Sequence, residues 1–222
     1  MSAPLPTPEE LATKLYAAVL SDVLDELGFM SQALKPFVRP LDDSLVLCGV
    51  ARTGLYRKVY HVESGRNPYQ VEMDLIDSLK PGEVAVLACD GPTDRIAPWG
   101  ELLTTAAQMR GAAGCLTDGL VRDVRRIREM RFPVFAGGIG PLDTKGRAEM
   151  IAMDVPVGIA GVRAESGDLV FGDVDGCVVV PKEIAPQALA RALEKVSAED
   201  RTREALLNGE SLNEVFRRFG VL

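Results

Sequence analysis

The central third of the chain alternates between helical and strand patterns, and this alternation constrains the fold more than any other feature. EVAVLACDG (83–91) is typical of a buried strand, and WGELLTTAAQMRGAAG (99–114) is typical of a helix. A short strand and turn (CLTDG), a helix (VRDVRRIREMR) and a further strand (FPVFAGG) follow in sequence. Helical and strand segments at such close spacing indicate a sheet with helices packed against it. We therefore expect an α/β fold.

The two ends of the chain carry helical patterns. An N-terminal helix is expected over about 8–28, where Thr7 and Glu10 can form a capping box and Gly28 is a natural stop. C-terminal helices are expected over about 183–219, where Ser211 and Glu214 can form a second capping box. A core over about 40–185 holds the strands, and after Gly146 these become short and are separated by Gly-Asp turns. Because we find no repeat or flexible linker, we predict a single domain over 1–222.

Charge argues against nucleic acid as a partner. The 25 Lys and Arg and 32 Asp and Glu residues leave a net charge of −7, whereas phosphate binding needs a concentrated basic surface. One basic run, VRDVRRIREMR, is interrupted by Asp123 and Glu129 and carries no aromatic residue to stack on bases. This run is typical of a solvated helix face.

The sequence also predicts a cytoplasmic protein without a membrane partner. No basic segment followed by an apolar core opens the chain, and no apolar run approaches the length of a membrane span. The four cysteines are widely spaced and lie in apolar stretches, as expected of reduced, buried thiols. A single histidine, His61, argues against a histidine-based zinc site or a Ser-His-Asp triad, and we expect it to be structural or exposed.

TDGLVRDV (117–124) places Asp118, Arg122 and Asp123 at one junction between a strand and a helix. A solvated loop is the simplest interpretation of such a charge cluster. A second helix start lies nearby, because Gly100 precedes a helix whose first amides, those of Glu101, Leu102 and Leu103, lack helical partners. Such a helix start attracts carboxylate or enolate oxygen atoms, although it can equally be a plain helix start with Glu101 placed favourably.

The chain between Glu101 and Arg122 reads as helix, turn and short strand, which returns it to the same edge of a sheet. Both helix starts can then face one crevice, where open sheets bind ligands. Carboxylates suit a hydrated Mg²⁺, and the Arg122 guanidinium suits bidentate capture of a substrate carboxylate. This combination predicts stabilisation of the enolate of a 2-oxo acid. The glycine-rich segment GGIGPLDTKGR (137–147) matches neither nucleotide fingerprint and is interpreted as a loop.

These residues resemble a known family. The D/E-x20-R-D arrangement of Glu101, Arg122 and Asp123 is similar to that of the 4-hydroxy-4-methyl-2-oxoglutarate aldolases, which share a superfamily with the regulator of ribonuclease activity A. The resemblance covers most of residues 12–185 and is most specific in GELLTTAAQMRGAAGCLTDGLVRD. It implies a single-domain layered α/β/α-type sandwich with a central mixed sheet, of the swivelling β/α type.

The resemblance also implies roles for the site residues. The substrate oxygen atoms would lie against Gly100, Glu101, Leu102 and Leu103. Arg122 would bind the substrate carboxylate, and Asp123 would ligate Mg²⁺ or Mn²⁺. Glu101 would hold metal-bound water, although aldolases commonly carry aspartate there. That departure leaves room for a shifted water or a different substrate. A homotrimer, or a hexamer built as a dimer of trimers, is implied as well.

Two functions follow from the resemblance. The first is a metal-dependent (class II) pyruvate aldolase that cleaves a 4-hydroxy-2-oxo acid, of the 4-hydroxy-4-methyl-2-oxoglutarate or 4-carboxy-4-hydroxy-2-oxoadipate type, to pyruvate and a second carbonyl compound. Oxaloacetate decarboxylation would be a side activity through the same pyruvate enolate. The alternative is a non-enzymatic protein that binds and regulates a ribonuclease.

Overall fold

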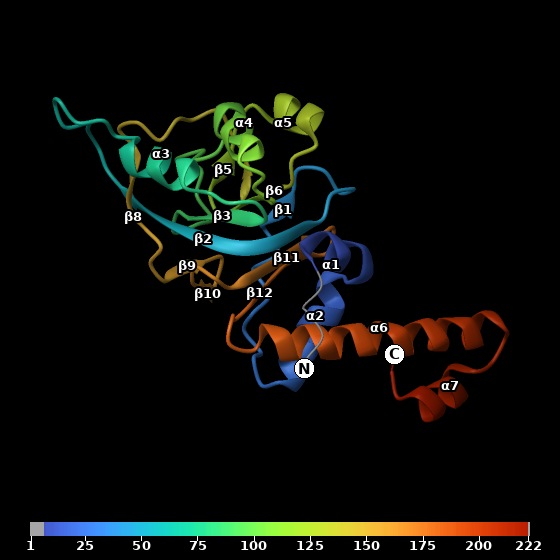
Figure 1. Cartoon of the computed structure of the whole chain (residues 1–222). Coiled ribbons are helices and arrows are strands. Elements are labelled where there is room, and N and C mark those ends of the chain that lie inside the picture. Colours follow the sequence, from blue (N-terminus) through green and yellow to red (C-terminus); the bar gives the residue numbers. More distant parts are fainter. Residues whose placement is uncertain (1–6, 222) are drawn as a thin grey trace.

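A mixed eight-stranded sheet forms the centre of the computed structural model, which describes residues 7–221 (Figure 1). Residues 1–6 and 222 of the predicted domain lie outside this described part. Across the sheet the strands follow the order β1 (Arg39–Pro40), β6 (Val134–Ala136), β4 (Gly114–Thr117), β3 (Glu83–Ala88), β2 (Leu47–Lys58), β11 (Leu169–Asp173) and β12 (Gly176–Val180). The eighth strand, β8 (Ala148–Met153), pairs with β2.

The long strand β2 connects the parallel and antiparallel parts of this sheet. One edge of β2 pairs in parallel with β3, from Val50 opposite Glu83 to Leu55 opposite Ala88. Its other edge pairs antiparallel with β11 near its start and with β8 near its end, where the register shifts between Leu55 and Tyr56. Twelve residues are long enough to serve three partners, so one apolar strand holds the parallel and antiparallel strands together.

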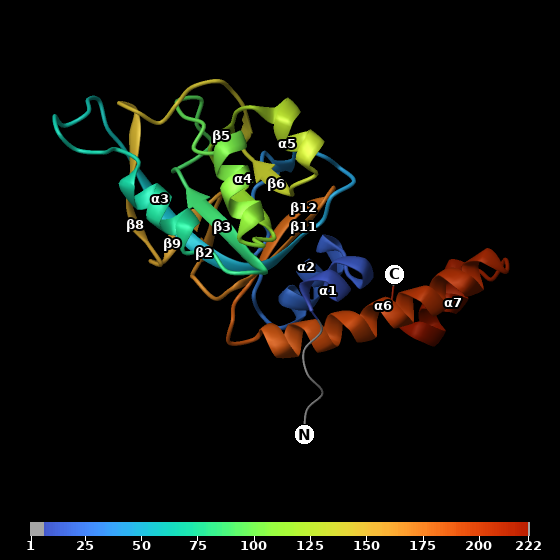
Figure 2. The ribbon, with the colours of Figure 1, turned by 45° about the horizontal axis from the view of Figure 1, so that its top comes forward.

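Helices pack against one face of the sheet, because the core around α3 (Gln70–Asp77), α4 (Glu101–Met109) and α5 (Val124–Met130) and the core around the terminal helices both take their strand residues from that face. Residues 157–164 and the loop with Leu34 and Val38 cover the other face. The predicted α/β fold with a central mixed sheet is confirmed. Trp99 and Ile127 are fully buried where α3, α4 and α5 lie over the sheet (Figure 2). Two further strand pairs complete this architecture. They are β5 (Leu120–Val121) with β7 (Gly138–Ile139), and β9 (Val157–Ile159) with β10 (Val162–Ala164).

The segment predicted as one N-terminal helix forms two. α1 (Pro8–Lys14) begins with the predicted capping box of Thr7 and Glu10, and α2 (Ala17–Glu26) follows after a break. Leu15 and Tyr16 are extended, and the amide of Ala17 donates a 2.8 Å hydrogen bond to the Asp173 carboxylate. A contact with a residue far along the chain therefore fixes the start of α2, and the local helical pattern did not contain that information. Gly28 follows the end of α2 with a φ of 87°, as the predicted stop requires.

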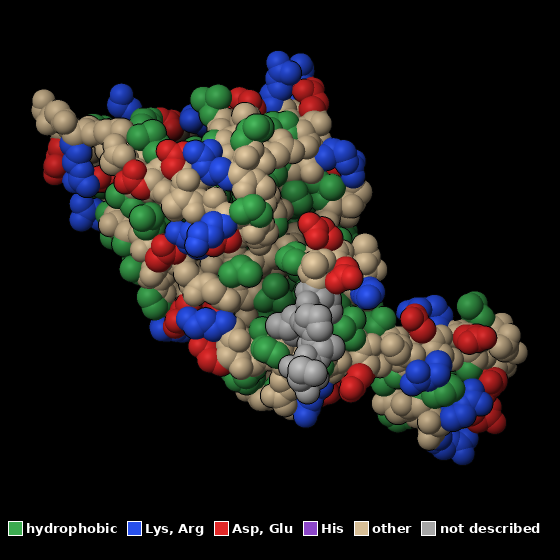
Figure 3. Space-filling model, in the orientation of Figure 1, with side chains coloured by type: hydrophobic (Ala, Val, Ile, Leu, Met, Phe, Trp, Pro, Cys, Tyr) green, Lys and Arg blue, Asp and Glu red, His purple; other side chains and the backbone are tan. Residues whose placement is uncertain are grey.

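The C-terminal helices are α6 (Ala185–Leu207) and α7 (Leu212–Phe219), and Ser211 with Glu214 forms the predicted capping box of α7. The first half of α6 packs against α2, while its second half and α7 extend beyond the sheet (Figures 1 and 2). Apolar side chains lie among charged ones on this extension (Figure 3). Leu207 is 82% exposed, Leu212 53% and Phe216 46%. No helix within residues 7–221 combines the length and apolar character that crossing a bilayer needs.

Asp118 is a structural residue of the junction between β4 and β5. Its side chain is buried and accepts hydrogen bonds from the amides of Cys89 at 2.7 Å, Gly91 at 2.8 Å and Ala160 at 3.4 Å. Burial raises the pKa of Asp118, and these amides lower it again in part. One carboxylate thus ties the end of β3 to the turn between β9 and β10. Asp118 is therefore no part of a solvated loop.

We predict that Asp118→Ala lowers the free energy of unfolding by roughly 2–3 kcal/mol, because it leaves buried amides without an acceptor. Urea unfolding followed by circular dichroism measures this change. Asp43→Ala, which removes an exposed carboxylate, is the matched control and should shift the midpoint little. Equal midpoints for the two variants would contradict the structural role of Asp118.

Candidate active site at the two helix starts

A pocket of about 420 Å³ lies where α3, the start of α4, the start of α5 and the loop after β7 meet. α4 and α5 each contribute their first residues, so the two helix starts predicted to share a crevice do share one. The lining residues are Tyr69, Glu72, Met73, Ala97, Pro98, Trp99, Gly100, Leu102, Leu103, Arg122, Asp123, Asp143 and Thr144.

Close backbone contact brings the two helix starts together. Trp99 pairs with Val121 in a parallel bridge, and the Arg122 amide donates a 3.0 Å hydrogen bond to the Trp99 carbonyl. Gly100 fills the contact, since a Cβ atom there would lie 2.7 Å from Asp123 Oδ2 and 3.1 Å from Arg122 Cγ. The backbone of Gly100 is extended, with a φ of −154°, so the requirement for glycine is steric. A side chain at this position would displace Arg122 and Asp123.

Trp99 fixes the wall behind Gly100. Its ring is fully buried and stacks on Phe132 with ring centroids 6.2 Å apart. The indole Nε1 donates a 2.8 Å hydrogen bond to Thr104 Oγ1, which in turn donates to the Gly100 carbonyl at 3.0 Å. The first turn of α4 is therefore held rigidly, and its amides have a fixed direction.

Asp123 adopts the left-handed conformation at the start of α5, with a φ of 58°. Aspartate tolerates this conformation better than most residues, and such strain is common at functional sites. The carboxylate does not cap its own helix. Its Oδ2 atom accepts a 3.2 Å hydrogen bond from the Glu101 amide and lies 4.0 Å from Arg122 Nε. The Asp123 side chain is 49% exposed and thus accessible from the pocket.

The backbone amide and the side-chain carboxylate of Glu101 face different parts of the surface. Its amide faces Asp123, whereas its carboxylate accepts a 3.0 Å hydrogen bond from Thr105 and lines a neighbouring hollow with Arg126 and Glu129. The other predicted site residues, Gly100, Leu102, Leu103, Arg122 and Asp123, all line the main pocket. The predicted role of Glu101 in holding metal-bound water stays a prediction, and its carboxylate would have to leave Thr105 to perform it.

The three other ionisable residues that line the pocket were missed by the sequence analysis. Asp143 lies 3.4 Å from Arg122 Nη2 through its Oδ1 atom, and its Oδ2 atom accepts a 2.5 Å hydrogen bond from the Tyr69 hydroxyl. Glu72, from α3, is the third. Asp143 belongs to the glycine-rich segment interpreted as a loop, and the parallel pairing of β5 with β7 carries that loop to Arg122. A polar residue soon after a predicted strand was the only available signal.

Glu72 is a buried acid within this pocket. It is 8% exposed, and its Oε2 atom accepts a 2.7 Å hydrogen bond from the Tyr56 hydroxyl. Burial raises the pKa of Glu72 to about 7, and the nearby Asp143 carboxylate adds to this rise. The hydrogen bond from Tyr56 and the charge of Arg122 act in the opposite direction. Glu72 can therefore exchange a proton near neutral pH.

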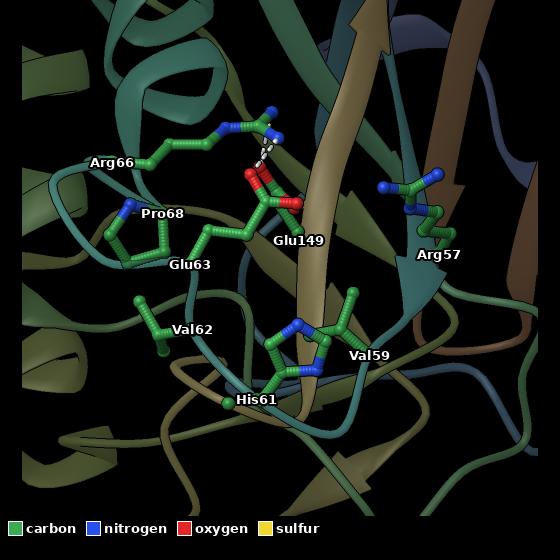
Figure 4. Close-up of a pocket in the computed structure, with 9 residues that line it drawn as sticks. Arg57, Val59, His61, Val62, Glu63, Arg66, Pro68 and Glu149 are labelled. Carbon is green, nitrogen blue, oxygen red and sulfur yellow. Dashed lines mark ion pairs between the residues drawn. The ribbon is translucent and has the colours of Figure 1, made fainter.

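His61 lies in a different and smaller pocket (Figure 4). This pocket has a volume of about 70 Å³, and its Arg66 pairs with Glu149 at 2.6 Å and with Glu63 at 3.5 Å. His61 is exposed, in agreement with the prediction of a structural or surface residue. The two pockets share no lining residue, so the chemistry of the larger pocket must use other groups.

The donor atoms of the larger pocket fit a hydrated ion rather than a closed metal cage. Within residues 7–221, no three His, Cys, Asp or Glu side chains come together as a preformed ligand set. Asp123 offers one accessible carboxylate beside the amides of α4. Mg²⁺ commonly binds through one or two carboxylates and keeps several waters, which substrate oxygen atoms can replace. Asp123 with waters and substrate is such a ligand set.

The mixed sheet and the helices packed on it define a mixed α/β protein, and its fold matches a solved structure of the RraA family. The RraA-like family model, described as Aldolase/RraA, matches residues 17–179. The chain therefore belongs to the RraA-like family.

Known relatives and structures agree with this assignment. The chain is 31% identical to a candidate 4-hydroxy-4-methyl-2-oxoglutarate aldolase of Halalkalibacterium halodurans, over 85% of this chain and 83% of the relative. It is 29% identical to protein DlpA of Legionella pneumophila over 89% of this chain, but spans only 31% of DlpA. The structure of Streptomyces coelicolor RraAS2, described as an unusual member of the RNase ES inhibitor RraA family, superposes with a TM-score of 0.77 and 28% identity, covering 90% and 99% of the two chains.

We predict that Glu72 makes stability fall with rising pH. Its pKa rises from 4.5 in the unfolded chain to about 7 in the folded one, so the folded state binds more protons between these values. The free energy of unfolding should therefore decrease between about pH 4.5 and 7, by a contribution on the order of 3 kcal/mol. Urea unfolding at several pH values measures the slope. Glu72→Gln should flatten it, while exposed Glu204→Gln should keep the wild-type profile; identical slopes for all three proteins would refute the assignment.

Proposed function

We propose that the protein is a divalent-metal-dependent lyase that cleaves a 4-hydroxy-2-oxo acid to pyruvate and a second carbonyl compound. One observation carries the proposal: a guanidinium, an accessible carboxylate and the first amides of a rigid helix line one pocket. Arg122 offers a planar fork to the substrate carboxylate, as the aldolase resemblance implies. The aldolase names of relatives support a lyase role.

The start of α4 orients the other substrate oxygen atoms. Because Leu102 and Leu103 lie in the first turn, their amides have no partner within the helix and attract negative oxygen. Asp123 would hold the divalent ion, Mg²⁺ or Mn²⁺. When bound, this ion supplies polarisation of the keto oxygen next to the substrate carboxylate.

The cleavage conserves atoms and charge. The C4 hydroxyl loses its proton, the C3–C4 bond breaks, and C4 becomes the carbonyl carbon of the second product. The bonding electron pair stays on the pyruvate fragment as its enolate, and a proton then adds to C3 to give pyruvate. Among the lining residues, Glu72 has a pKa suited to proton exchange at neutral pH, and buried Trp99 closes one wall against water.

We predict divalent-metal-dependent pyruvate release from 4-hydroxy-2-oxo acids, with loss of activity in a chelator. Asp123→Asn should reduce turnover roughly a hundred- to thousand-fold, since an amide lacks the charge that a hard ion prefers. Asparagine tolerates the left-handed backbone, so folding should persist. Manganese titration should show weaker binding, and high Mg²⁺ or Mn²⁺ should restore part of the activity.

Full turnover of Asp123→Asn at trace metal concentration would exclude the metal role. The likeness to the RNase ES inhibitor family keeps a ribonuclease regulator as the second candidate, and fold alone does not decide between them. Metal-independent retention of a ribonuclease in a pull-down, together with no pyruvate release from any substrate, would favour the regulator.

We also propose that the chain assembles as a homotrimer or a dimer of trimers. The apolar side chains exposed on the projecting part of α6 and α7 support assembly, because an apolar surface of this kind tends to be covered by a partner. Light scattering on the eluting protein should give about three or six times the chain mass of 23.9 kDa. A monomer at micromolar concentration would contradict this prediction.

A further inference from the structure

The charges that line the active-site pocket are unbalanced. Arg122 is the one Lys, Arg or His side chain among the described lining residues, and it shares the pocket with Glu72, Asp123 and Asp143. The guanidinium already lies beside two carboxylates, with Nη2 3.4 Å from Asp143 and Nε 4.0 Å from Asp123. Its positive charge is therefore compensated before a substrate enters.

Charge compensation limits what the substrate can carry. Under the proposed function, the C1 carboxylate binds Arg122 and a divalent ion binds Asp123. With Glu72 protonated, the pocket then holds three positive charges and three negative ones: Arg122 and the ion against Asp123, Asp143 and the C1 carboxylate. A second substrate carboxylate would be the first uncompensated charge, and it would share the pocket with the Asp143 carboxylate. Like charges in one partly buried pocket repel each other strongly.

The side of the pocket formed by α3 and the loop after β7 is suited to hydroxyl groups. Asp143 Oδ2 already accepts a hydrogen bond from Tyr69 and Oδ1 forms an ion pair with Arg122, but each carboxylate oxygen has a further lone pair. Glu72 presents a second carboxyl group, and Thr144 a hydroxyl. Met73 adds an apolar surface that is 38% exposed.

We propose that this pocket selects 4-hydroxy-2-oxo acids with a neutral, hydroxylated tail and discriminates against those with a second carboxylate, with Asp143 as the main specificity-determining residue. This inference rests on the proposed function. It differs from the dicarboxylate and tricarboxylate substrates that the family resemblance implies.

Two substrates of equal length isolate the charge of the tail. 4,5-Dihydroxy-2-oxopentanoate ends in a hydroxymethyl group and would give pyruvate and glycolaldehyde. 4-Hydroxy-2-oxoglutarate ends in a carboxylate and would give pyruvate and glyoxylate. We expect kcat/KM for the neutral substrate to be higher by about tenfold or more.

Charge variants with matched controls test the cause. Asp143→Asn is nearly isosteric and keeps one oxygen toward Arg122, while its amide nitrogen can donate to the Tyr69 hydroxyl. It removes one negative charge and should shift the preference about tenfold toward 4-hydroxy-2-oxoglutarate. Met73→Lys adds a cation to the pocket and should shift it in the same direction. Asp43→Asn and Met109→Lys make the same changes of charge at exposed positions outside the pocket, and they should leave the preference unchanged.

Binding of unreactive analogues separates this inference from the proposed function. Calorimetry with Mg²⁺ compares 2-oxoglutarate with 5-hydroxy-2-oxopentanoate, which lack the C4 hydroxyl and cannot be cleaved. Tighter binding of the neutral analogue supports the inference whether or not turnover occurs. An equal or greater kcat/KM for 4-hydroxy-2-oxoglutarate overturns the inference but leaves the lyase intact. If neither substrate releases pyruvate, the proposed function fails, and equal binding of the two analogues would overturn the specificity as well.

Discussion

The contact between the starts of α4 and α5 is the constraint on which the site depends. The Arg122 amide donates a hydrogen bond to the Trp99 carbonyl, and the two segments lie so close at Gly100 that a side chain there would not fit. Trp99 and Thr104 hold the first turn of α4 from the buried side, so neither helix start can move away from the other. A guanidinium, a carboxylate and a row of amides therefore face the same space without any preformed metal cage. A site of this kind is completed by its ligand and by water.

Much of the fold and part of the site could be predicted from the sequence. Alternating patterns gave the α/β class, and both capping boxes formed where Thr7 and Ser211 indicated. Gly100, Arg122 and Asp123 could be predicted as site residues because the motif and the two helix starts lie close in sequence. The break between α1 and α2 could not be predicted, because it depends on a hydrogen bond from the Ala17 amide to the distant Asp173 carboxylate.

The remaining pocket residues escaped prediction for the same reason. Tyr69 and Glu72 come from α3 and Asp143 from a loop beyond β7, and nothing in their local sequence indicates that they meet. For Glu101, the sequence identified the residue but not the direction of its side chain. Its position in the motif was visible, but the sequence could not show that its carboxylate binds Thr105 while its amide alone faces Asp123.

Asp118 and Asp123 lie in the same charged junction but have different roles, one structural and one in the candidate site. Asp118 is 1% exposed and its carboxylate accepts hydrogen bonds from backbone amides, so its removal should lower the free energy of unfolding. Asp123 is five positions further on, half-exposed, and bonded to only one amide, so its carboxylate remains accessible to a ligand. The buried acid fixes the loop from which the exposed acid extends. The opposite burial of the two carboxylates, rather than their proximity in sequence, therefore separates the structural residue from the candidate ligand.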